Sequence, residues 1–336
     1  MARCDFAAGR IGARRGRLLG PRGLRELVAR PDLPARLELL RQSGYAGLVP
    51  PAGRGGDGAL ADVERGLLDL SRRESLRLLR DIEGRRPGRL FAAFLRLGDA
   101  ENVKTLLRGL AGSESAERLR ALTAPSVGLD EEALARLAAQ PDPAAAARLL
   151  DELGSPFAGA VAEALPGLSR PGGLLRLDAA VDRAFLSLAR SAARRAGEDG
   201  RLLAGVLGGW ADARNAATLL SLSGEGDPGE FFLPGGARLG EGRFRRLARL
   251  GPEALRQALR DLAPPVALGD PFRADHLLGA ALRRATRRAA RGAPLSLAVP
   301  LSFALDRNAE VRRVRLVLRG ALFGLPADDL LDLVEA

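Results

Sequence analysis

The stretch Asp99-Ala-Glu-Asn-Val-Lys-Thr-Leu-Leu107 decides the fold, because it recurs further along the chain as Asp212-Ala-Arg-Asn-Ala-Ala-Thr-Leu-Leu220. Both copies hold Asp, Asn, Thr and Leu-Leu at matching places. Chance matches are less expected for Asp, Asn and Thr here than for the abundant Leu, Ala and Arg. A third copy, Val314-Arg-Leu-Val-Leu-Arg-Gly320, matches Val103 to Gly109. Recurrence at a spacing of roughly 110 residues indicates a chain built from repeated units.

Apolar residues that follow each copy repeat at the same spacing. One matching set is Leu24, Leu134 and Phe244, and another is Leu27, Leu137 and Leu247. We therefore expect a single domain, residues 1–336, made of approximate repeats at 1–98, 99–210 and 211–307 and a truncated restart at 308–336.

The apolar residues of the deciding stretch have helical spacing. Val103, Leu106, Leu107 and Leu110 stand at i, i+3, i+4 and i+7, which places them on one face of a helix. Alternation over β-branched residues is nearly absent, so few strands are expected. The chain is therefore predicted to be all-α and more than about 60% helical. Long helices are expected at about 59–83, 86–111, 174–196, 201–222 and 274–291.

Acidic residues indicate where helices begin. Asp99 and Asp212 are expected at an N-cap or in a first turn, where a carboxylate stabilises a helix. Residues near 99, 212 and 310 are accordingly predicted to open equivalent helices. The pairs Glu131-Glu132 and Asp328-Asp329 are also interpreted as helix-start charges rather than as catalytic carboxylates.

Scarce residue types exclude much of enzyme chemistry. The 336 residues include one His, His276, and one Lys, Lys104, so a two-histidine metal site and a Walker A loop are both absent. Cys4 is the only cysteine, which excludes an internal disulfide and fits a reducing cytoplasm. The run from Gly53 to Gly58 satisfies G-x-G-x-x-G but follows Pro50-Pro51 instead of a strand, and is interpreted as a connector. No catalytic residue, metal or cofactor is predicted, and Lys104→Ala is expected to leave the activity of the assembled complex within a few-fold of normal.

Arginine accounts for most of the net charge of +11. It gathers in three clusters: Arg10, Arg14, Arg15 and Arg17; Arg283, Arg284, Arg287, Arg288 and Arg291; and Arg312, Arg313, Arg315 and Arg319. Each cluster is interpreted as a solvated face in an Arg-rich proteome, or as a surface for an acidic protein or anionic lipid. Nucleic acid is disfavoured, because aromatic interleaving, a zinc module and a helix-turn-helix are all absent.

Two further features are candidates for partner binding. The doublet Phe231-Phe232 lies among glycines and either anchors a partner or fills the space between helices. Arg108 and Arg319 occupy matching positions in two copies, at predicted helix ends. Their recurrence suggests that they line one inner surface, and reversing both charges is expected to keep the fold. His276 is expected to be a surface or cap histidine.

In their order and spacing, the motifs resemble the C subunit of the A/V-type rotary ATPases, whose eukaryotic vacuolar relative is called the d subunit. The resemblance spans the chain and rests on five stretches: Phe6 to Leu19, Asp99 to Gly109, Asp212 to Leu220, Phe231-Phe-Leu-Pro-Gly-Gly236 and Glu310 to Pro326. The low aromatic content and the abundance of Arg depart from the family pattern.

The resemblance implies a non-catalytic, funnel-shaped rotor protein of the central stalk with pseudo-threefold symmetry, present once per complex. Such a protein caps the cytoplasmic face of the membrane ring of proteolipids (c/L-type) and receives the tip of the central shaft (D/F-type). It couples ion transport to ATP synthesis or hydrolysis and is attached peripherally to a bacterial or archaeal plasma membrane. The candidate partner-binding residues are Arg14, Arg15, Arg108, Phe231, Phe232, Arg312 and Arg319.

Two other readings of the sequence stay open. One is a helical-repeat scaffold that binds an acidic protein or nucleic acid. The other is a soluble hydrolase whose site has no recognisable motif. Strongly salt-dependent binding to random nucleic acid would favour the scaffold.

Overall fold

The computed structural model describes residues 5–51, 57–82, 86–222, 227–260 and 271–335. About three quarters of these residues are helical, and none of them forms a strand. The prediction of an all-α chain with more than about 60% helix is therefore confirmed.

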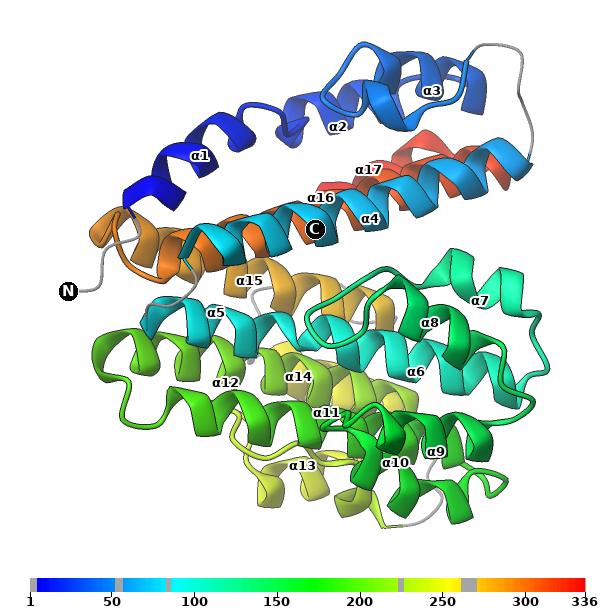
Figure 1. Cartoon of the computed structure of the whole chain (residues 1–336), viewed down its shortest axis with the longest axis vertical. Coiled ribbons are helices and arrows are strands. Elements are labelled where there is room, and N and C mark those ends of the chain that lie inside the picture. The colour runs from blue at the N-terminus through cyan, green and yellow to red at the C-terminus, as the bar shows by residue number, and fades with distance from the viewer. Residues whose placement is uncertain (1–4, 52–56, 83–85, 223–226, 261–270, 336) are drawn as a thin grey trace.

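Long helices in the described part of the chain form three hairpins that run side by side (Figure 1). The first joins α4 (Asp57–Ile82) to α5 (Arg86–Leu95) and α6 (Leu97–Ala111), the second α11 (Gly173–Ala193) to α12 (Gly197–Ser221), and the third α15 (Pro271–Gly292) to α16 (Ala298–Leu322). The long helices predicted from the sequence are confirmed, with bounds that differ by a few residues.

Shorter helices follow each hairpin. After the first come α7 (Ala116–Leu122), α8 (Glu131–Ala138), α9 (Pro143–Glu152), α10 (Ala158–Ala164) and η2 (Leu165–Gly167). After the second come η3 (Pro228–Phe231), α13 (Glu241–Leu247) and α14 (Pro252–Arg260), and after the third comes α17 (Ala327–Glu335). Glu131-Glu132 and Asp328-Asp329 stand in the first turns of α8 and α17, which confirms their placement at helix starts.

The N-terminal helices pack on the C-terminal ones. They are α1 (Asp5–Arg15), α2 (Gly20–Val28), α3 (Leu33–Arg41) and η1 (Ala46–Leu48). Figure 1 shows α1 to α3 lying along α16 and α17. Leu24 and Leu27 of α2 are buried in one apolar cluster with Val314 and Leu318 of α16. The two ends of the chain therefore share a core.

Two of the three expected helix starts are wrong. Asp99 does lie in the first turn of α6, but Asp212 lies deep inside α12, and Glu310 lies inside α16. In α12 the helix begins earlier, because Leu203 and Leu207 continue its apolar face into the core. The three carboxylates are buried rather than exposed at helix ends.

Each of these carboxylates instead holds the loop that leads into a short helix. Asp99 accepts a hydrogen bond from the Gly128 N–H before α8, and Glu310 accepts from the N–H groups of Leu19 and Gly20 at the start of α2. For Asp212 the donors are the N–H groups of Ala237, Arg238 and Leu239, before α13. A Cβ at Gly236 would stand 2.0 Å from the Asp212 Oδ1, so this loop requires glycine for its close approach.

Asparagine side chains one turn further along the helix add a second link. The Asn215 amide donates to the Leu233 carbonyl and accepts from the Leu233 N–H, both at 2.8 Å. Asn102 makes the same pair of bonds with the Ala124 backbone. The shared Asp and Asn of the two sequence copies thus have the same structural task, because buried backbone groups in loops require partners. The repeat boundaries, the funnel shape and the pseudo-threefold axis stay predictions.

Candidate functional site

Five helices bring cationic side chains together. We call Arg72 of α4, Arg108 of α6, Arg214 of α12, Arg283 of α15 and Arg312 of α16 the basic surface. Arg72 and Arg312 line the same cavity, and the charges of these arginines act on one another's pKa. The charge of Arg312 lowers the pKa of Arg72 on α4 and of Arg283 on α15. The charge of Arg214 likewise lowers the pKa of Arg108 on α6.

Crowding of like charges shapes the electrostatics of this surface. Burial lowers the pKa of Arg283 to about 10, and the neighbouring charges of Arg313 and Arg312 add to the effect. Burial likewise lowers the pKa of Arg72, and the charge of Arg312 acts in the same direction. In both cases burial is the main cause of the lowered pKa, and the carboxylates Asp99 and Glu101 act in the opposite direction on Arg72, as Asp306 does on Arg283.

Glu101 of α6 is a carboxylate on which the charges of this surface act. Its partial burial acts to raise its pKa, but the charges of Lys104, Arg214 and Arg312 outweigh burial and hold the pKa at about 2. Glu101 is therefore ionised at any physiological pH. Other carboxylates also balance the cations of this surface, because Arg108 pairs with Asp178 and Arg214 with Asp182.

A cavity of about 210 Å³ opens where α4, α6 and α16 meet. Its charged lining consists of Arg72, Glu101, Arg312 and Arg315, and its polar lining includes Ser71 and Asn308. The Ser71 hydroxyl donates to the Asn308 side-chain carbonyl at 2.5 Å, which leaves the amide nitrogen of Asn308 as a donor. The rest of the lining includes apolar side chains, among them Leu68, Leu97 and Val311.

Lys104 lies fully buried beside this region. Its Nζ is 2.9 Å from the Glu101 Oε1 and 2.7 Å from the Asp182 Oδ1 on α11. Arg214 of α12 also pairs with Asp182, at 3.1 Å. The only lysine thus ties the first hairpin to the second. Sequence reasoning excluded Lys104 from a nucleotide site but missed this role, because no local pattern shows which distant carboxylates will surround it.

Ion pairs also join the other candidate arginines to neighbouring hairpins. Arg108 pairs with Asp178 of α11. Arg319 makes a two-pronged pair with Glu64 of α4, with nitrogen-to-oxygen distances of 2.6 and 2.9 Å. Asp178 and Glu64 are almost buried, with side chains 7% and 11% exposed. Both arginines lie in the last turns of their helices, as predicted. Each charge reversal would place two carboxylates together and is therefore expected to destabilise the fold; that the fold is kept stays a prediction.

The remaining sequence candidates lie elsewhere. Arg15 donates to the Ser302 hydroxyl at 2.5 Å and so fastens α1 to α16, and Arg14 is partly buried on the same helix. Phe231 and Phe232 are buried. Phe232 packs against Phe244 with ring centroids 5.4 Å apart. The doublet fills the space between helices, which is the second of its two readings.

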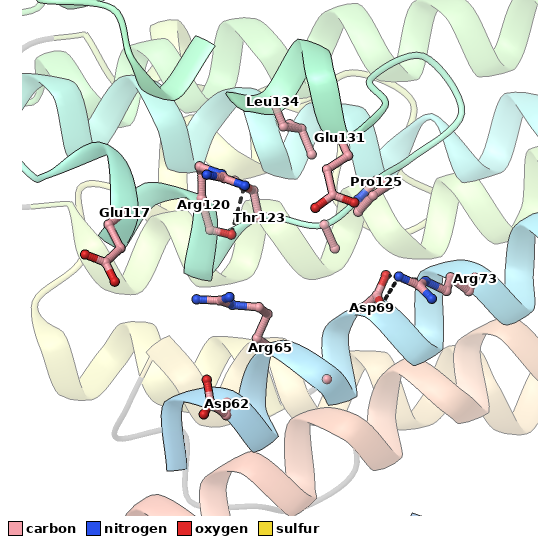
Figure 2. A pocket seen from close by; sticks show the side chains of 12 residues that line it. Asp62, Arg65, Asp69, Arg73, Glu117, Arg120, Thr123, Pro125, Glu131 and Leu134 are labelled. Carbon is pink, nitrogen blue, oxygen red and sulfur yellow. Dashed lines mark hydrogen bonds and ion pairs between the residues drawn. The ribbon is translucent and has the colours of Figure 1, made fainter. Parts of the chain in front are cut away.

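A larger cleft, about 550 Å³, separates α4 from α7 and α8. Figure 2 shows Arg65 extending from α4 toward the opposite wall, with Asp62 and Asp69 on its own helix and Glu117 and Arg120 across the gap. Positive and negative side chains alternate around this cleft. Neither sign of charge dominates its lining.

Other sequence features give no site. No group of three or more His, Cys, Asp or Glu in the described ranges could hold a metal ion. Among the helices of those ranges, none combines the length and hydrophobicity of a membrane span. Residues 53–56 of the glycine run and the side chain of His276 lie outside the described part of the structure.

Comparison with known proteins gives a consistent result over the full chain. The family model described as ATP synthase (C/AC39) subunit matches residues 7–333. The V-type ATP synthase C subunit of Thermus thermophilus is 32% identical, over 96% of this chain and 96% of the relative. The A-type ATP synthase C subunit of Halorubrum lacusprofundi is 29% identical, over 97% of this chain and 95% of the relative. The V-type ATP synthase C subunit of Deinococcus radiodurans is 26% identical, over 97% and 90%.

Proposed function

Because the chain belongs to the ATP synthase (C/AC39) subunit family, we propose that it is the non-catalytic central-stalk component that couples a membrane ring to a shaft. In this role it caps the ring of proteolipid subunits and receives the tip of the shaft subunits. Ion flow turns the ring, and the chain transmits the torque toward ATP synthesis, or in the reverse direction during hydrolysis.

The observation that supports this proposal most is the closed circuit of links among the three hairpins. Lys104 joins the first hairpin to the second through Asp182. The third returns to the first through the pairs of Arg307 with Glu74 and of Arg319 with Glu64. Between the second and third, α12 packs closely along α15. Each hairpin is therefore held by both of its neighbours.

A circuit of this kind suits a part that transmits torque. One charge that crosses a potential of 100 mV releases about 2.3 kcal/mol, and a compliant joint would store or dissipate that energy. Close-packed helices deform little, and buried ion pairs are costly to separate. Stiffness around the whole circuit is thus the property that the proposed role requires.

The proposed setting follows from the family. The relatives in Thermus and Halorubrum are named as subunits of V-type and A-type ATP synthases. We place one copy of this chain in each complex, at the cytoplasmic face of the membrane, without a cofactor and without a nucleic acid partner. Contact with the membrane surface beside the ring is part of the same proposal.

The test is the composition of the intact complex and of its parts. Native mass spectrometry of the complex from the source organism is expected to find one copy of this chain. Subcomplexes released by mild dissociation should retain it with both the proteolipid ring and the shaft subunits. The isolated chain should hydrolyse no ATP. A ring and shaft that stay joined after this chain has dissociated would contradict the proposal.

A further inference from the structure

The turns of the three hairpins lie at one end of the molecule. Figure 1 shows this end at the left, where α4 is followed by α5, α11 by α12 and α15 by α16. The Leu297 N–H, just before α16, donates to the Asp199 carboxylate in the first turn of α12 at 3.1 Å. The second and third turns are therefore in direct contact, and the hairpins share one end surface.

Exposed arginines dominate this end. We call the following residues the hairpin-end surface: Arg80, Arg86 and Arg89 of the first hairpin, Arg194, Arg195 and Arg201 of the second, and Arg288 and Arg291 of the third. Within the described part of the chain, none of them has a carboxylate at ion-pairing distance. They differ in this from Arg108 and Arg319, which are paired with Asp178 and Glu64.

The described carboxylates of these turns balance little of that charge. Asp81 pairs with Arg10 at 2.8 Å, and Asp199 accepts the hydrogen bond from the Leu297 N–H. Glu198 is exposed. The hairpin-end surface therefore keeps an excess of positive charge that no contact within the described fold uses.

A groove in the second turn gives part of this charge a defined shape. The groove has a volume of about 600 Å³, and its lining combines Arg194, Arg195 and Arg201 with small residues such as Ala196 and Gly200. Guanidinium groups match the oxygens of a phosphate in geometry and charge. The groove is therefore suited to a phosphate-containing head group.

The third turn adds an apolar side chain to the cations. Leu295 is 36% exposed and follows Arg291 by four residues. Cationic side chains next to an exposed leucine are typical of surfaces that lie on a membrane interface. The turn can therefore contact both the charged and the apolar part of that interface.

We propose that the hairpin-end surface docks on anionic phospholipid head groups, and that the phosphate of one head group occupies the groove of the second turn. This inference rests on the proposed function, which places the chain beside a membrane. Cations that extend over three turns match a layer of anionic head groups, because each cation near such a surface strengthens binding. A small soluble anion would contact one turn alone.

The experiment measures binding of the full chain to lipid vesicles by flotation. The vesicles consist of phosphatidylcholine alone, or of phosphatidylcholine with about one third phosphatidylglycerol. At about 50 mM NaCl the wild type should bind the anionic vesicles at least about 100-fold more strongly than the neutral ones. At about 400 mM NaCl most of this preference should be lost, because salt screens exposed charges.

The test variant removes one arginine from each turn. Arg86→Gln/Arg194→Gln/Arg291→Gln should lower the partition coefficient on anionic vesicles about 100-fold, because one cation near an anionic surface contributes about fivefold. Sodium phosphate at equal ionic strength should displace the chain no more than NaCl does. The three side chains are exposed, so the variant should unfold at the same temperature as the wild type.

A matched control removes the same charge at the other end of the molecule. Arg118→Gln/Arg120→Gln/Arg136→Gln changes exposed arginines of α7 and α8, which lie at the right in Figure 1. This variant should bind anionic vesicles as the wild type does. Equal losses in the two variants would overturn the inference in favour of net charge alone.

Other outcomes would also contradict the inference. Wild-type chain that does not prefer anionic vesicles, or a test variant that binds them unchanged, would overturn it. Selective displacement by phosphate would overturn it in favour of a soluble anion. Each of these results leaves the proposed function intact, because the retention of ring and shaft in subcomplexes tests that function separately.

Discussion

Replacing Lys104 by Met is expected to lower the free energy of unfolding by about 3–5 kcal/mol. The side chain is 1% exposed and its Nζ contacts Glu101 and Asp182. Met has a similar length but no charge, so the variant leaves Asp182 with one fewer cation in a buried position. Urea denaturation at pH 7 measures the change. The expectation drawn from sequence alone concerned the activity of the assembled complex after Lys104→Ala, which is a different quantity, and it stays a prediction.

The pH dependence of the same variant gives an independent check. In the wild type the pKa of Glu101 lies at about 2, below its unfolded value of about 4.3. Its ionised form therefore stabilises the fold above about pH 4, and this contribution is lost as the pH falls from about 4 toward 2. Without Lys104 the depression should be smaller, so the difference between wild type and variant should shrink toward pH 3.

A second variant serves as the control for Lys104→Met. Lys104→Met/Asp182→Leu removes both partners, and is expected to recover part of the lost stability because no carboxylate then stays buried without its cation. A loss below about 1 kcal/mol for Lys104→Met at pH 7 would show that this contact does not join the hairpins.

Replacing Arg307 by Leu is expected to cost a similar amount, about 3–5 kcal/mol. Arg307 of α16 is 2% exposed and its guanidinium contacts both carboxylate oxygens of Glu74 on α4, at 2.7 and 3.1 Å. It also donates to the Tyr45 hydroxyl, which in turn donates to Glu310. The variant leaves Glu74 buried without a cation, and weakens the link between α4 and α16.

Thermal and urea unfolding of two variants measure this effect. Arg307→Leu/Glu74→Leu replaces the pair by apolar side chains and should be markedly more stable than Arg307→Leu, because an ion pair replaced as a unit is often nearly neutral. Equal stability of the single and double variants would mean that the Arg307–Glu74 pair does not hold the first and third hairpins together.

Local features of the fold were predictable from the sequence. Helical spacing of residues such as Val103, Leu106 and Leu107 located the long helices, and Leu24, Leu134 and Phe244 are all buried as their recurrence suggested. The recurrence of Asp and Asn also pointed to a shared task. For Asp212 the predicted task, that of a helix start, was wrong. A carboxylate that accepts hydrogen bonds from a distant loop can have the same local sequence as one at a helix start, so the sequence did not separate the two roles.

The site was predictable only in part, because it depends on contacts between distant segments. Arg108 and Arg312 were identified as candidates and belong to the basic surface, whereas Arg319 forms an internal pair with Glu64. Arg72 and Arg214 lie outside the three arginine clusters of the sequence and were missed. Their relevance arises from tertiary packing, which brings single residues of five helices together. The internal sequence similarity of the chain does not specify which charged side chains will form ion pairs in the folded structure.

The coupling ratio tests the central claim most directly. In membrane vesicles that contain the rotary complex stripped of this chain, ATP hydrolysis by the head is expected to continue while ATP-driven ion uptake is lost. Addition of the purified chain should restore ion uptake in proportion to the amount bound, and the ratio of ions moved to ATP hydrolysed should return to that of the intact complex. An unchanged ratio in the stripped complex would contradict the claim that this chain connects the ring to the shaft.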